Sequence, residues 1–133
     1  MRLEFTIFAP PITKKNHSQI IKVNGRPMLI PSKEYRQYEK DVAPFMPKLD
    51  KPIDFPVNVQ ATFYKPTRRA SDLTNHLEAL NDLMVKYGVI ADDNRNIVYT
   101  LNNSKVLYSK DNPRTEVVLT DIPEEEFERW KDG

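Results

Sequence analysis

The chain has 133 residues, of which 39% are hydrophobic and 29% are charged, and its formal net charge is +1. This length suits one domain, and we expect a single domain over residues 1–133. The absence of cysteine excludes disulfides and cysteine-ligated zinc or iron–sulfur sites. No segment approaches the ~20 apolar residues of a membrane helix, and the first residues lack the apolar run of a signal peptide, so we expect a cytoplasmic protein without membrane contact.

Alternating and turn-forming patterns in the first half of the chain predict a strand, a hairpin and a helix. Residues 3–8 alternate in polarity and predict a strand, which the two prolines that follow would end. Asn24-Gly25 lies between two apolar runs within residues 20–30 and predicts a hairpin turn, because both residues tolerate a positive φ. Ser32 offers a helix N-cap, apolar residues follow at roughly helical spacing as far as Phe45, and Pro44 and Pro47 would end this helix.

The second half of the chain predicts a long helix between strands. Residues 57–64 alternate strongly, which indicates a half-buried strand. Apolar residues at helical spacing predict an amphipathic helix from Asp72 or Leu73 to Tyr87, with Gly88 as its C-cap. The fold class that this pattern favours is α+β. Further strands are expected over residues 97–101, 105–108 and 114–120, and a short helix is expected in the acidic tail, residues 121–133.

The small net charge hides an asymmetry along the chain. Residues 1–70 carry 13 Lys and Arg against 6 Asp and Glu, whereas residues 71–133 carry 7 against 13. A basic half beside an acidic half is compatible with a polyanion-binding surface next to a metal-binding cluster. An ordinary charged surface, divided by chance, would give the same counts.

Carboxylates at both ends of the long predicted helix are candidate metal ligands. Asp72 lies at its start, and Asp92-Asp93 follow its C-cap. Phosphodiester hydrolysis commonly uses Mg²⁺ or Mn²⁺ held by such oxygen ligands. Residue types alone favour a helix cap and a solvated turn. A helix of about 15 residues spans about 22 Å, so the chain must fold back after Gly88, or a second subunit must supply partners.

An ordered set of motifs decides between these interpretations. Residues 68–83 are Arg-Arg-Ala-Ser-Asp-Leu-Thr-Asn-His-Leu-Glu-Ala-Leu-Asn-Asp-Leu, and residues 88–93 are Gly-Val-Ile-Ala-Asp-Asp. This order resembles the core of the RusA family of Holliday-junction resolvases: Asp-Leu-Asp-Asn, a helix ending in Asp-(Ala/Leu)-Leu, then Gly and Asp-Asp. The Pro-Pro-Ile-Thr-Lys-Lys-Asn segment at 10–16 and Ser-Lys-Glu-Tyr-Arg at 32–36 also resemble family segments, so the resemblance extends to about residue 120.

The resemblance implies both a fold and an activity. It implies a small mixed sheet packed with two main helices, in an intertwined homodimer. It also implies an Mg²⁺-dependent endonuclease, with Mn²⁺ as the alternative metal, that resolves four-way DNA junctions in recombination and repair. No small-molecule cofactor is implied, and the family's frequent occurrence on phages suggests a viral origin. The alternative is a RusA-like module that binds branched DNA without cutting it.

Carried over by position, the resemblance assigns metal ligands to Asp72 and Asp93, with Asp92 as an adjacent ligand or positioning residue. The chain departs from the family motif at Thr74, where the family has its second Asp, and at Glu78, where well-known members have a Lys. Because Glu78 is four residues further along the same helix face, its carboxylate is a candidate replacement. The hypothesis is a three-carboxylate site of Asp72, Glu78 and Asp93, with Asp82 in a supporting or surface role.

Basic and amide side chains near these motifs are candidate DNA ligands. Arginine and lysine contact phosphate oxygens, which gives the group a functional interpretation, although for each residue alone a solvated loop is an equal alternative. The single histidine within the helix, His76, has no nearby histidine partner, so we expect it at the surface. The DNA-contacting candidates are Lys14, Lys15, Asn16, Arg68, Arg69 and Asn75.

Overall fold

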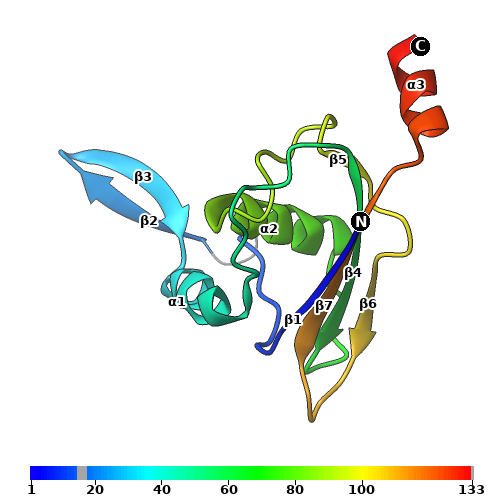
Figure 1. The fold of residues 1–133 in the computed structure, drawn as a ribbon. Coiled ribbons are helices and arrows are strands. Elements are labelled where there is room, and N and C mark those ends of the chain that lie inside the picture. Colours follow the sequence, from blue (N-terminus) through cyan, green and yellow to red (C-terminus); the bar gives the residue numbers. More distant parts are fainter. Residues whose placement is uncertain (15–17, 133) are drawn as a thin grey trace.

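The computed structural model describes residues 1–14 and 18–132, so two expected DNA-contacting residues, Lys15 and Asn16, lie outside the described residues. The elements follow the order expected from the sequence (Figure 1). They are β1 (Arg2–Ile7), β2 (Ser18–Val23), β3 (Arg26–Pro31), α1 (Lys33–Val42), the 3₁₀ turn η1 (Ala43–Phe45), β4 (Val57–Lys65), α2 (Leu73–Lys86), β5 (Val98–Thr100), β6 (Lys105–Tyr108), β7 (Arg114–Asp121) and α3 (Glu124–Asp132).

Local signals account for most of these boundaries. Asn24 and Gly25 have φ values of 54° and 79°, which join β2 to β3 in the predicted tight turn. The Ser32 side chain accepts a hydrogen bond from the Tyr35 N–H and caps α1. Pro44 and Pro47 were expected to end this helix, and α1 does end at Val42, after which the chain continues as η1, because Pro44 lacks the N–H that an α-helix needs.

The main sheet is mixed, in agreement with the expected α+β class. Its strand order is β1-β7-β4-β5, and β6 also pairs with β4. β7 runs antiparallel to both β1 and β4, whereas β5 and β6 run parallel to successive parts of β4. The β2–β3 hairpin forms a separate two-stranded sheet that extends away from the main sheet (Figure 1).

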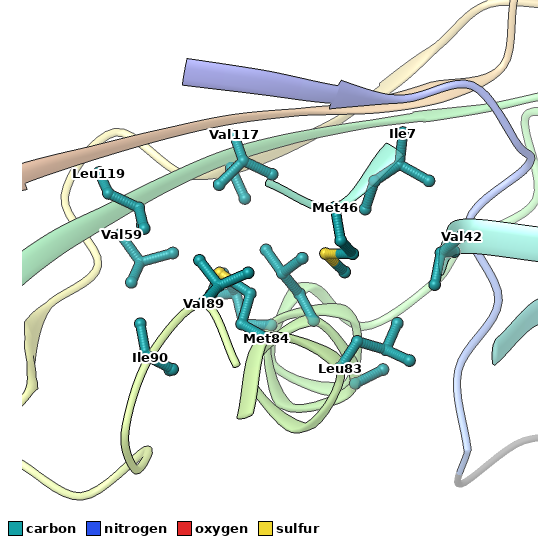
Figure 2. Packing of buried hydrophobic residues seen from close by; sticks show 14 of the residues in the cluster. Ile7, Val42, Met46, Val59, Leu83, Met84, Val89, Ile90, Val117 and Leu119 are labelled. Atoms are coloured by element: carbon teal, nitrogen blue, oxygen red, sulfur yellow. The ribbon is translucent and has the colours of Figure 1, made fainter. Parts of the chain in front are cut away.

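The core lies between this sheet and α2. Alternate residues of β4 and β7 point into the core, as their period of two requires. The apolar stripe of α2 faces them, and α1 closes one side (Figure 2). Burial of this stripe therefore leaves the opposite face of α2 for polar residues. The stripe includes Leu77, Leu80, Leu83 and Met84, each at most 5% exposed.

After α2 the chain folds back within the same subunit. Gly88 has a φ of 72°, in the left-handed region that suits a helix C-cap. The N–H of Val89 then donates to the carbonyl of Met84 at 2.8 Å, and Ile90 forms a bridge with Ile53. The N–H of Ala91 donates to the Ile53 carbonyl at 2.9 Å, which positions the next two residues, Asp92 and Asp93, beside α2. Of the residues that the structure describes, no helix is long and apolar enough to cross a membrane.

Candidate functional site

One face of α2 carries polar side chains from its start to its third turn. Asp72 is the N-cap residue, but its carboxylate makes no hydrogen bond to the helix backbone and instead accepts one from the Asn75 amide at 3.3 Å. Glu78 is exposed, and Asp82 is half-buried, four residues further on. Spacings of three and four residues keep these groups on one helix face. The Asp72 carboxylate is therefore free to take part in chemistry beyond helix capping.

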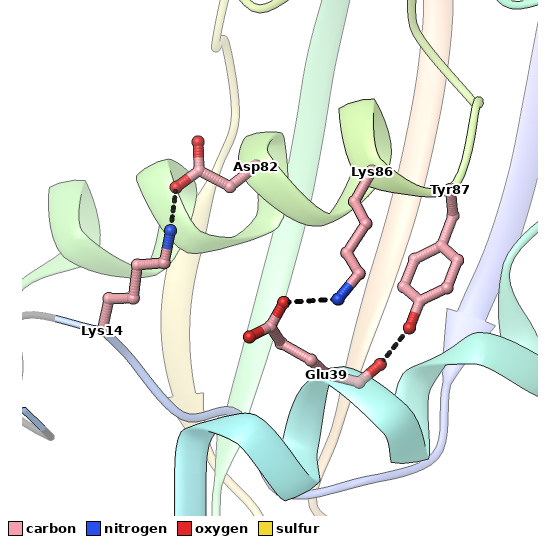
Figure 3. A network of polar contacts seen from close by, with 5 residues as sticks. All are labelled: Lys14, Glu39, Asp82, Lys86 and Tyr87. Atoms are coloured by element: carbon pink, nitrogen blue, oxygen red, sulfur yellow. Dashed lines mark hydrogen bonds and ion pairs between the residues drawn. The ribbon is translucent and has the colours of Figure 1, made fainter. Parts of the chain in front are cut away.

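A pocket of about 330 Å³ lies at the far end of this face, between α1 and α2. We call it the acidic pocket, because three of its lining residues carry carboxylates: Glu39, Asp82 and Asp93. Two lysines balance part of this charge (Figure 3). The Lys14 ammonium lies 3.3 Å from Asp82, and the Lys86 ammonium lies 2.9 Å from Glu39.

Asp93 is the carboxylate of the acidic pocket with the most adverse surroundings. Its pKa is raised, first by partial burial, then by a hydrogen bond with the Asp92 carboxyl and by the negative charge of Asp82. The Asp92 carboxylate also accepts a hydrogen bond from the Asp93 N–H at 2.7 Å. Asp93 thus lies near two other acids, and a cation bound beside it would relieve their repulsion.

Tyr35 also lines the acidic pocket. Its side chain is completely buried, and its hydroxyl has no hydrogen-bond partner among the described residues. Burial raises the pKa of this hydroxyl, and the charges of Glu39, Asp82 and Glu78 raise it further. Glu78 therefore belongs to the same electrostatic environment as the acidic pocket. The hydroxyl therefore stays protonated at neutral pH.

The arrangement differs from a ready-made three-carboxylate site within one subunit. In residues 1–14 and 18–132, no three His, Cys, Asp or Glu side chains are grouped closely enough to hold a metal. Asp93 lies beside Asp82, whereas Asp72 precedes Asp82 by ten residues, about 15 Å along the helix axis. Mg²⁺ often takes only one or two protein carboxylates and completes its shell with water and phosphate. The pair of Asp82 and Asp93 therefore fits such an ion in number and donor type.

The geometry makes Asp82 a stronger candidate metal ligand than the sequence suggested. Its sequence context favoured a supporting or surface role, yet it is the α2 carboxylate that lies beside Asp93. The sequence contained one usable signal, since Asp82 lies four residues after Glu78 and matches an acidic position of the family motif. The proximity of Asp82 to Asp93 depends on the fold-back after Gly88, which spacing alone does not specify.

The two arginines expected to contact DNA lie in different environments. The Arg68 guanidinium stacks over the Tyr108 ring, 4.0 Å from its centroid. Arg69 instead lines a cavity beside the start of α2, together with Lys65. Of the other basic candidates, Lys14 forms the ion pair with Asp82 described above. Arg68 and Arg69 therefore present their charges to different surfaces of the molecule.

The prediction that His76 lies at the surface is wrong. His76 is 2% exposed and stacks on Phe63 of β4, with 5.0 Å between ring centroids. Its Nε2 lies 3.2 Å from the Ser71 hydroxyl. His76 lies beside Leu77 on the core-facing side of α2, so the packing of α2 on the sheet buries its ring. Burial, followed by the charge of Lys65, lowers the pKa of His76 to about 4.

Comparison with known proteins adds one finding to this geometry. The family model described as Endodeoxyribonuclease RusA matches residues 9–120. The match includes every predicted site residue, from Lys14 to Asp93, and ends before α3. No curated protein matches the chain.

Proposed function

Because the chain belongs to the RusA family of endodeoxyribonucleases, we propose that it is a metal-dependent nuclease that cuts branched DNA, with the Holliday junction as its substrate. Its role would be in recombination and repair, and its place of action the cytoplasm. The observation that supports the metal dependence is that Asp93 and Asp82 line the same pocket, where Lys14 pairs with Asp82 and the pKa of Asp93 is raised by partial burial, Asp92 and Asp82.

Asp93 is the proposed principal metal ligand, and Asp82 and Glu78 are the candidates for the second position. Bound Mg²⁺, or Mn²⁺ in its place, would supply a Lewis acid that activates water and neutralises the attacked phosphate. Asp92 supports Asp93 through the hydrogen bond that its carboxylate accepts from the Asp93 N–H at 2.7 Å. Asp72, at the opposite end of the α2 polar face, is proposed to act across a homodimer, in a site that also contains the other subunit's acidic pocket.

Lys14 is proposed to leave Asp82 and to contact a DNA phosphate when a metal ion binds to the site. Its ammonium neutralises Asp82 at 3.3 Å. A divalent cation on the carboxylates would repel this ammonium and release it to a neighbouring phosphate. The ion pair is partly exposed, with 44% of the Lys14 side chain and 36% of the Asp82 side chain accessible, so the exchange requires little reorganisation.

A homodimer follows from the symmetry of the proposed substrate. Resolving a four-way junction requires two cuts that are related by a two-fold axis, and a dimer with one site in each subunit provides that relation. Asn75, Arg68, Arg69 and the released Lys14 are the proposed contacts to DNA phosphates within the described residues, because they flank the carboxylates along the chain.

A cleavage assay tests this function. Purified protein is incubated with a synthetic four-way junction in Mg²⁺, in Mn²⁺ and in EDTA, beside the Asp93→Asn variant and a control variant, Asp50→Asn, at an exposed position outside the proposed site. We expect paired, metal-dependent cuts that Asp93→Asn abolishes and Asp50→Asn retains. Thr74 in place of the family Asp favours the second candidate, a non-cutting module, and tight metal-independent binding without cleavage would establish it instead.

A further inference from the structure

A second cavity, of about 440 Å³, lies between the segment after β1, the end of β4 and the start of α2. We call it the basic cavity, because its charged lining residues are Lys65 and Arg69, and none of its lining residues is a carboxylate. Its volume falls within the usual range for small-ligand sites. It is lined by Pro10, Pro11, Ile12, Thr13, Lys65, Pro66, Thr67, Arg69, Ala70, Ser71 and His76.

The two cations of the basic cavity are held close together without a counter-ion. The Lys65 ammonium is half-buried and donates to the carbonyl of Pro11 at 3.3 Å. Burial lowers the pKa of Lys65, and the positive charge of Arg69 lowers it further. Neither cation has an ion pair with a carboxylate among the described residues. The cavity therefore favours an anion that accepts hydrogen bonds from both.

Hydroxyl groups and apolar surfaces complete the lining. Thr13 is 5% exposed, and the Ser71 hydroxyl is held at 3.2 Å from His76 Nε2. The lining thus divides into cationic and hydroxyl groups and apolar groups, the latter being three prolines and Ile12. A charged group with several acceptor oxygens, joined to a less polar ring, matches this division. A phosphate attached to a deoxyribose has that chemistry.

We propose that the basic cavity binds one nucleotide of the DNA substrate through its phosphate. The inference rests on the proposed function for the source of the phosphate, and it extends that function by fixing where the strand is held. Ser71 lines the cavity and Asp72 follows it directly, so a strand anchored there would continue onto the polar face of α2. The cavity would thereby orient the scissile strand toward the carboxylates.

Histidine NMR provides a direct measurement of occupancy. The chain has only two histidines, so a His17→Gln variant leaves His76, in the lining, as the single imidazole signal. With EDTA present, this protein is titrated with inorganic phosphate, thymidine 5′-monophosphate and a thymidine dodecamer. We expect saturable shifts of the His76 ring signals with the dodecamer and with the monophosphate. Shifts with the monophosphate but none with the dodecamer would overturn DNA as the source, and no shift with either would overturn the site.

Charge-removing variants give the second measurement. Lys65→Gln and Arg69→Gln are each expected to weaken four-way-junction binding in EDTA by about tenfold, the usual effect of losing a charge-assisted hydrogen bond. Lys48→Gln removes the same charge at an exposed position outside the cavity and should change affinity less than about twofold. Equal affinities for all three variants would contradict the proposal. Arg69 is exposed, so its variant remains informative if Lys65→Gln does not fold.

The two proposals fail in different ways. If the wild-type protein never cuts a junction, the proposed function fails, while the His76 titration still reports on the cavity. If the junction is cut but neither cavity variant changes junction binding, the proposed nuclease function is supported and the proposed role of the basic cavity is wrong. Asp93→Asn is expected to keep the His76 shifts, because Asp93 lies in the acidic pocket and outside the basic cavity.

Discussion

Asp93 combines exposure to solvent with an adverse electrostatic position. Its folded-state pKa is raised by partial burial, by Asp92 and by Asp82. A carboxyl with a raised pKa disfavours the folded state once it ionises, so its effect on stability worsens as the pH rises above its ordinary value of 3.8. A carboxylate in a structural ion pair would have a lowered pKa, and its contribution to folding stability would increase as the pH rises. The shift therefore has the sign expected of a carboxylate that a bound cation would stabilise.

The first prediction concerns Asp93→Asn. Without metal at neutral pH, this variant should melt at a higher temperature than the wild type, because the substitution removes a repelled charge. Mg²⁺ should raise the melting temperature of the wild type and leave that of the variant unchanged. Junction cleavage should fall on the order of 100-fold or more. Thermal melts with and without Mg²⁺ check the prediction, and an equal Mg²⁺ response in both proteins would remove Asp93 from the ligand set.

Glu78 tests whether a carboxylate gained on α2 replaces the one lost at position 74. Glu78→Ala should weaken Mg²⁺ binding and slow cleavage by about tenfold or more if Glu78 is a ligand. Thr74→Asp in the same background should restore part of the lost activity. The metal dependence of cleavage measures both effects. A Glu78→Ala protein that binds Mg²⁺ and cuts normally would leave the second position to Asp82.

His76 predicts a pH dependence of stability. Burial and the charge of Lys65 lower its pKa from 6.5 to about 4, with Asp72 opposing the shift. Between these values the unfolded chain binds a proton that the folded chain does not. Stability should therefore be complete above pH 6.5 and fall by up to about 3 kcal/mol as the pH drops toward 4. Urea unfolding across this range checks the slope, and a His76→Gln variant with the same slope would assign it to other groups.

At the scale of the elements, the turn after α2 decides where the carboxylates lie. Gly88 adopts a φ of 72°, and an added Cβ there would meet no atom within 4 Å. The cost of a side chain at this position therefore arises within the local backbone, and no contact with another part of the protein adds to it. The turn leads into the Ile53–Ile90 bridge, so strain at Gly88 reaches Asp92 and Asp93 directly.

Gly88→Ala is accordingly predicted to lower stability by about 1–2 kcal/mol, the cost of a left-handed alanine. Cleavage should also decrease, because the acidic pocket depends on this turn. Gly25→Ala is the matched control, since Gly25 has a φ of 79° with the same open surroundings but lies in the hairpin turn. Denaturant unfolding and cleavage rates are compared. Equal losses of cleavage in both variants would show that the geometry of the acidic pocket does not depend on the turn after α2.

At the scale of the whole molecule, the separation of Asp72 from Asp93 makes the proposed dimer testable. If one active site combines Asp72 of one subunit with Asp93 of the other, a mixed dimer of Asp72→Asn and Asp93→Asn subunits contains one intact site. Each variant alone contains none. We therefore predict that refolded mixtures regain nicking of a four-way junction, whereas either variant alone stays inactive. Failure of the mixture to nick, with mixed dimers confirmed by mass, would place each complete site within one subunit.

The sequence by itself determined the elements, because the signals for them are local. Alternation in β4, the Ser32 cap, the Asn24-Gly25 turn and the periodicity of α2 each act within a few residues. The end of α1 at Val42 is local in the same way, since Pro44 lies two residues further on. The resemblance to the RusA family also identified the candidate carboxylates in advance.

Only the tertiary structure decided which side chains lie together. Lys14 and Asp82 are 68 residues apart in sequence yet lie within 3.3 Å. Asp82 meets Asp93 because the chain turns back at Gly88, and Asp72 is kept from them by the rigid length of α2. His76 is buried because the packing of α2 on the sheet places its ring against Phe63. Such pairings depend on packing between distant segments, and the spacing of residues along the sequence does not predict that packing.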